Sequence, residues 1–131
     1  MWKRILLATD GTPKSRRAEE LAFDLARATQ AELLVVSVAH AASEEDRGSG
    51  MREAMDTVSQ VAARGRALGL QLEAAVERGE PAQAIVAAAQ ARNADVVVMG
   101  TEGKAGLTRA LLGSVAETVA RNSPVTVIIA K

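Results

Sequence analysis

The 131-residue chain contains no cysteine, and its only aromatic residues are Trp2 and Phe23. Without thiols it cannot form disulfide bonds, zinc–thiolate sites or iron–sulfur clusters, and it has no cysteine nucleophile. Two aromatic rings also offer little surface on which nucleic-acid bases could stack. The sequence therefore predicts a core of aliphatic side chains and argues against nucleic acid as a partner.

An excess of charge of one sign is also absent, as are long apolar runs. Sixteen Lys and Arg balance sixteen Asp and Glu, so no net charge attracts the chain to a polyanion. The apolar stretch after Lys3 and Arg4 ends at Asp10, which is too short for a signal peptide, and no run approaches the ~20 apolar residues of a membrane span. We therefore expect one cytoplasmic domain, over residues 1–131, that binds neither nucleic acid nor membrane.

Short apolar strands alternate with helical patterns along the whole chain. Strands are predicted at residues 5–8, 33–39, 70–76, 95–99 and 125–129. Between them, apolar residues recur at helical spacing and predict four helices. In the second helix Met51 and Met55 are expected in the core, and Pro81 is expected at the start of the third. Strict alternation predicts a single-domain, three-layer, Rossmann-like α/β fold, with helices on both faces of a parallel sheet.

A glycine-rich segment follows the fourth expected strand and carries the spacing G-x2-G-x9-G-S, formed by Gly100, Gly103, Gly113 and Ser114. Glycines let several backbone N–H groups converge on one anion. A helix that begins near Ser114 would add unpaired N–H groups and the positive end of its dipole. The Ser114 hydroxyl could cap that helix or donate to a phosphate oxygen, and Lys104 could add a positive charge. The segment therefore predicts a nucleotide-phosphate site.

At these residues the chain resembles the universal stress protein family, in the branch whose members bind ATP and share this glycine spacing. The resemblance extends over nearly the whole chain, including residues 5–11, 76–81 and 114–125. It implies one universal stress protein domain over residues 1–131 and a five-stranded parallel sheet of order 3-2-1-4-5. The nucleotide site would lie where the sheet reverses direction, between the first and fourth strands.

The resemblance also implies roles for individual residues. Asp10 would accept hydrogen bonds from the ribose hydroxyls, and Val38 would offer backbone groups to the adenine edge. The remaining positions are the walls of the base and ribose pocket (Ala8, Thr9 and Met99) and the phosphate-holding residues (Gly100, Gly103, Gly113, Ser114 and Val115), with Lys104 beside them. No catalytic and no metal-ligating residue is predicted.

Three positions carry other interpretations. Asp10 could simply cap the first helix, because Asp before Gly-Thr-Pro is a common turn. Glu102 stands where the family often has a basic or imidazole side chain. A carboxylate there would weaken triphosphate binding unless it points outward or shares a metal ion. His40 is expected to be a surface loop residue.

The first functional hypothesis is an ATP-binding stress-response or regulatory protein, with or without Mg²⁺. The second is a slow ATPase or self-phosphorylating protein, although no general base is evident near the site hydroxyls. The third is a partner-binding module with a vestigial nucleotide site.

The resemblance further implies a homodimer in which the last strand, Val125 to Ile129, pairs with its copy. The alternative is an edge strand covered within the monomer.

Overall fold

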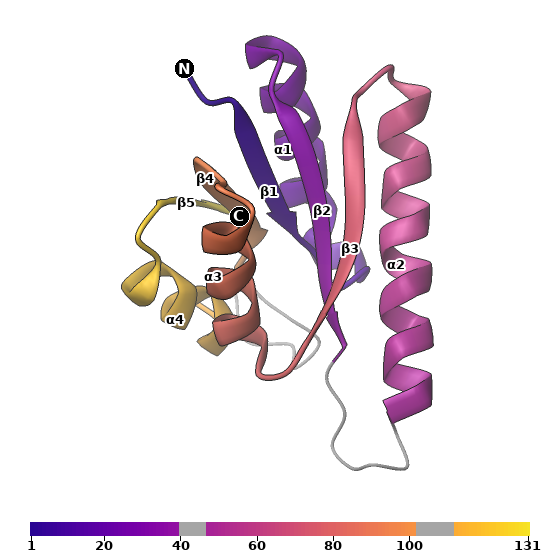
Figure 1. Cartoon of the computed structure of the whole chain (residues 1–131), viewed down its shortest axis with the longest axis vertical. Helices are drawn as coiled ribbons and strands as arrows, with labels where there is room; N and C mark the ends of the chain where they lie inside the picture. The colour runs from indigo at the N-terminus through magenta and orange to yellow at the C-terminus, as the bar shows by residue number, and fades with distance from the viewer. Residues whose placement is uncertain (40–46, 102–111) are drawn as a thin grey trace.

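The computed structural model describes residues 1–39, 47–101 and 112–131. Within these ranges, strands and helices alternate as the sequence predicts (Figure 1). The elements are β1 (Arg4–Ala8), the 3-10 helix η1 (Pro13–Ser15), α1 (Arg16–Thr29), β2 (Glu32–Ala39), α2 (Arg47–Ala67), β3 (Leu72–Arg78), α3 (Pro81–Ala91), β4 (Val96–Gly100), α4 (Ser114–Asn122) and β5 (Thr126–Ala130). All strand pairs are parallel and the order is β3-β2-β1-β4-β5. The predicted α/β fold and strand order are confirmed.

Helices cover both faces of the sheet (Figure 1). Residues that alternate along a strand point to opposite faces, so Leu7 packs with α1 and α2 while the adjacent Leu6 packs with α3 and α4. The central strands β1 and β4 are buried on both faces. This two-sided burial explains why their sequences are almost continuously apolar.

Helix α2 differs from its prediction in its start and in its buried face. It begins at Arg47, although the polar, glycine-containing stretch from His40 to Gly50 favours a loop, and Met55 is 53% exposed. The buried face instead carries small and β-branched residues, namely Ala54, Thr57, Val58, Val61, Ala62 and Gly65. A Cβ atom at Gly65 would collide with Leu72 and press on the Phe23 ring. Close packing against β3 and α1 therefore fixes the rotation of α2 and leaves Met55 on the outside.

A buried ion pair joins the two helices on this face of the sheet. The side chain of Glu19 in α1 is only 4% exposed and accepts hydrogen bonds from Arg64 in α2 at 2.5 and 3.1 Å. The same hydrogen bonds raise the pKa of Arg64 above its ordinary value. Oε2 of Glu19 also lies 3.6 Å from Nε of Arg16, so this carboxylate has two cationic partners.

The sheet has edges at β3 and β5, as the sequence predicts for both strands. Residues 127–130 of β5 are half-buried. None of the helices in the described ranges is long and apolar enough to cross a membrane.

Candidate functional site

A cavity of about 540 Å³ opens at the carboxyl ends of β1, β2 and β4. In Figure 1 these ends point toward the lower part of the view. β1 pairs with both β2 and β4, so the connections that follow β1 and β4 run in opposite directions across the sheet. Open α/β sheets bind ligands at such a reversal. The volume is typical of a small-molecule site.

The structure brings together every expected site residue that it describes. The cavity walls include Ala8, Thr9, Asp10, Val38, Met99, Gly100, Gly113, Ser114 and Val115. The other expected site residues, Gly103 and Lys104, lie outside the described residues, as do Glu102 and His40. The cavity therefore joins residues from β1, β2, β4 and α4 that are far apart in the sequence.

The amino end of α4 forms one wall of the cavity. Gly113 is the N-cap, and its carbonyl accepts the first helical hydrogen bond from Glu117 N–H at 2.9 Å. Ser114 is therefore the first helical residue, so of the two alternatives for its hydroxyl the helix cap is excluded. Gly113 donates its own N–H to the Thr101 carbonyl at 2.6 Å. The N–H groups of Ser114, Val115 and Ala116 have no acceptor within the helix, and these three residues line the cavity.

A hydrogen-bonded turn after β1 forms another wall of the cavity. Gly11 adopts φ +77°, which reverses the chain where a side chain would be strained. Oδ1 of Asp10 accepts hydrogen bonds from the N–H of Thr12 at 3.0 Å and from its hydroxyl at 2.7 Å. The N-caps of η1 and α1 are Thr12 and Ser15. Asp10 therefore forms the turn that the alternative interpretation expects before Gly-Thr-Pro, although it is not itself the N-cap of a helix.

Other lining residues were missed by the sequence analysis. The largest group comes from α2 and consists of Gly50, Glu53, Ala54 and Thr57; further positions are Ser15, Val36, Ser37, Pro81, Ile85 and Ala116. Helix α2 follows β2 in the chain, and it reaches the cavity only because it packs back along β2 and β3. No local motif marks its lining residues, so the sequence offers no signal from which they could have been found.

The charges that line the cavity are negative. Among the described lining residues, Asp10 and Glu53 are the charged ones. Nowhere in the described ranges do three or more His, Asp or Glu side chains gather in a way that could hold a metal ion. An anion bound by the described residues would therefore rest on the N–H groups and dipole of α4, while Asp10 suits hydroxyl donors.

Comparisons with known proteins give the family. Residues 1–131 match the model of the universal stress protein family. A universal stress protein of Thermus aquaticus is 34% identical, and the match covers 100% of both chains. A solved structure of a universal stress protein in complex with cAMP is similar at 29% identity and a TM-score of 0.80, covering 99% of this chain and 97% of the other. A universal stress protein of Archaeoglobus fulgidus, solved in complex with dAMP, is similar at 25% identity and a TM-score of 0.78, covering 98% of each chain. The chain therefore belongs to the universal stress protein family.

Proposed function

We propose that this universal stress protein binds ATP in the cavity at the carboxyl ends of β1, β2 and β4, as a member of the ATP-binding branch. Its role would be regulatory, because nucleotide occupancy would change its shape or its choice of partner. The observation that carries the proposal is that the Asp10 carboxylate lines the same cavity as the N–H groups of α4 that have no acceptor within the helix. Two structural neighbours, bound to cAMP and dAMP, hold adenine nucleotides.

The lining residues fit the three parts of such a nucleotide. The adenine would lie toward β2 and α2, between the apolar side chains of Val38 and Ala54. Asp10 would accept hydrogen bonds from the ribose hydroxyls. The phosphates would meet the N–H groups of Ser114, Val115 and Ala116, where backbone donors and the helix dipole stabilise negative charge. Gly103 and Lys104 would complete the phosphate side.

The β5 edge supports a second proposal, a homodimer formed through residues 126–130. Three consecutive large apolar residues, Val127, Ile128 and Ile129, are only half-buried on this outermost strand. An exposed, apolar strand edge invites pairing with another strand, and two copies related by a two-fold axis would cover both edges. Light scattering coupled to gel filtration should give twice the mass of one chain, and a single-chain mass would exclude this dimer.

The nucleotide is best identified from the protein itself. Gently purified protein should be denatured and the released small molecules identified by mass spectrometry, before and after incubation with millimolar ATP. We expect an adenine nucleotide in near one-to-one ratio with the chain. Release of no nucleotide after incubation, or of guanine nucleotides alone from the freshly purified protein, would overturn the proposal.

A further inference from the structure

We propose that Thr12 is a positioning residue for the nucleotide site, and that it presents the Asp10 carboxylate to the ribose hydroxyls of the ligand. This inference rests on the proposed nucleotide function. Asp10 lines the cavity, whereas Thr12 does not. Any effect of Thr12 on a ligand must therefore pass through the residues that it holds.

Every polar group of Thr12 is hydrogen-bonded to the turn between β1 and α1. Its N–H and hydroxyl both donate to Oδ1 of Asp10, at 3.0 and 2.7 Å. Its carbonyl accepts from the N–H and the hydroxyl of Ser15, at 3.0 and 2.8 Å. Thr12 thus links the carboxylate on one side of the turn to the start of α1 on the other.

The local sequence favours the hydrogen bond from the Thr12 hydroxyl to Asp10. A residue that precedes proline is restricted to extended conformations, and Thr12, which precedes Pro13, has φ −76° and ψ 158°. It occupies the N-cap position of η1, where a threonine hydroxyl ordinarily accepts from the helix N–H groups. Here it makes no such bond and turns back to Asp10 instead. Its hydroxyl is therefore directed at the carboxylate rather than at the helix.

A second set of hydrogen bonds stabilises the same turn. The Thr9 and Ser15 hydroxyls lie 3.0 Å apart in a buried position, and the N–H of Gly11 donates to Thr9 Oγ1 at 3.2 Å. Because these bonds do not involve Thr12, they should keep the turn folded when the Thr12 hydroxyl is removed. Substitution of Thr12 can then change the carboxylate without dismantling the site.

Two bonds to one oxygen leave the other oxygen for a ligand. A carboxylate oxygen offers two lone pairs, and Oδ1 of Asp10 accepts two hydrogen bonds. These two bonds restrict rotation of the carboxylate. None of the described residues donates a hydrogen bond to Oδ2, the oxygen that would accept from a ligand hydroxyl. Substitution of Thr12 should therefore lower the affinity for a ribonucleotide, and it should leave the affinity for a ligand without ribose hydroxyls nearly unchanged.

The test compares ATP with 2′,3′-dideoxyATP, by calorimetric titration of the full chain. Hydrogen bonds to a charged group are worth about tenfold or more in affinity, so the wild type should prefer ATP by at least ~10-fold. Thr12→Val keeps the shape and the extended preference but removes the hydroxyl, and it should lower this preference to about threefold or less. Affinity for the dideoxy nucleotide should stay within about twofold of the wild type, and Thr12→Ser should restore the preference.

The controls separate positioning from a structural role. Thr29→Val removes a hydroxyl that bonds Leu25 O at 2.7 Å at the far end of α1, and it should leave both affinities unchanged. Thermal unfolding should show that Thr12→Val is folded, and Thr12→Ala gives the same comparison if it is not. The inference is overturned if the variant keeps the full preference, or if it weakens both nucleotides equally. A wild-type chain that binds neither nucleotide would refute the nucleotide function itself, and the inference with it.

Discussion

Each end of the sheet carries a cavity, of about 540 Å³ at the carboxyl end and 450 Å³ at the amino end. The polar groups at the two ends are paired differently. At the amino end the charges satisfy one another. Asp95, just before β4, accepts hydrogen bonds from the N–H groups of Lys3 and Arg4 at 2.7 and 2.8 Å. The Arg4 side chain in turn lies 3.4 Å from Glu32.

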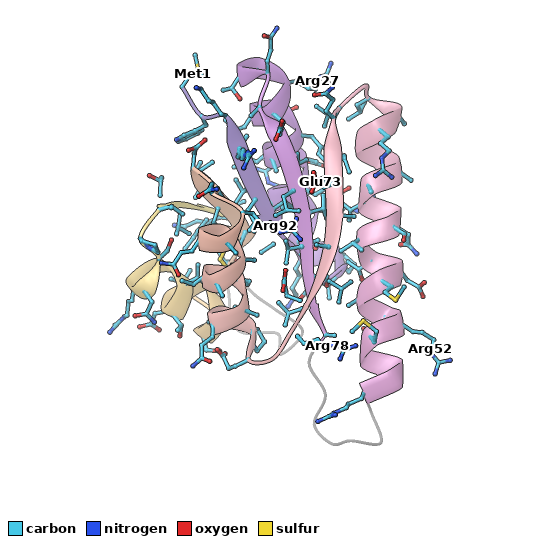
Figure 2. All side chains as sticks on the ribbon, viewed as in Figure 1. Met1, Arg27, Arg52, Glu73, Arg78 and Arg92 are labelled. Atoms are coloured by element: carbon cyan, nitrogen blue, oxygen red, sulfur yellow. The ribbon has the colours of Figure 1, made fainter. Side chains whose placement is uncertain are left out.

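The pair of Arg92 and Glu73 completes this pattern, with 3.3 Å between Nη1 and Oε2. Figure 2 shows Glu73 on β3 and Arg92 at the end of α3. At the carboxyl end, by contrast, hydrogen bonds hold the backbone turn, and within the described residues Oδ2 of Asp10 and the first N–H groups of α4 have no hydrogen-bond partner. The two cavities are therefore similar in size but differ in how their polar groups are paired.

The largest effect should follow from filling the carboxyl-end cavity. Gly113 is buried and lines it, so the side chain of Gly113→Val would occupy space that the phosphates need beside α4. ATP affinity should fall by at least about 100-fold, or ~2.7 kcal/mol of binding free energy, as measured by titration calorimetry. Gly48→Val is the matched control, because among the described residues a Cβ there meets only Arg52, at 3.7 Å. Equal affinity in the two variants would remove Gly113 from the site.

A smaller loss should follow from removing the carboxylate of the turn. Asp10→Ala should weaken ATP binding by about tenfold or more, because hydrogen bonds to a charged acceptor are lost. Asp95→Ala removes a carboxylate from the opposite end of the sheet and should leave affinity unchanged. Similar losses of ATP affinity in both variants would show that Asp10 matters no more for binding than a carboxylate at the opposite end of the sheet.

The packing of the turn against α2 can be tested with two glycines of positive φ. Gly11 has φ +77°, and a Cβ there would lie 2.6 Å from Thr57 Oγ1; Gly69, between α2 and β3, has φ +82° and nothing within 4 Å. Gly69→Ala should cost about 1 kcal/mol of unfolding free energy from backbone strain alone. Gly11→Ala should cost about 2–4 kcal/mol, since it adds a steric clash.

Denaturant unfolding measures both costs. Thr57→Ala removes the clashing atoms, so the Gly11→Ala/Thr57→Ala double variant should be more stable than the sum of the single effects predicts. Additive effects would show that α2 does not press on the turn at Gly11.

The smallest effect concerns acid stability at the amino end. Hydrogen bonds from the backbone of Lys3 and Arg4 lower the pKa of Asp95 in the folded protein. A lowered pKa stabilises the fold at pH values above the ordinary range of Asp, and this contribution is lost as the pH falls through the folded-state pKa. Asp95→Asn should lower the Tm by about 3 °C at pH 7, and the difference should shrink near pH 3. A difference that grows as the pH falls would contradict the assignment.

Much of the fold could be predicted because local patterns agree with it. Buried strands such as residues 96–100 are apolar, and the Glu80-Pro81 pair starts α3 as expected, with Glu80 accepting from Ala82 and Gln83 N–H. Met55 was misassigned because its spacing from Met51 suggests a buried stripe. The tight contact at Gly65, made with residues distant in sequence, decides which face is buried instead.

The candidate site was predictable only where a motif marks it. The glycine spacing marked residues after β4 and at the start of α4, and the family resemblance added positions on or beside β1 and β2, such as Asp10 and Val38. The α2 wall and Ser15 depend on tertiary packing. The hydrogen bonds of Thr12 likewise depend on a turn that several residues form together. Sequence spacing locates such a turn, but the partner of each hydroxyl follows from its three-dimensional shape.

The central claim is that the carboxyl-end cavity binds an adenine nucleotide, and direct titration of nucleotide-free protein with ATP tests it most simply. The account predicts saturable binding of one ATP per chain in the wild type and in Gly48→Val, with binding lost in Gly113→Val. An absence of binding by the wild type up to millimolar ATP, both with and without Mg²⁺, would contradict it.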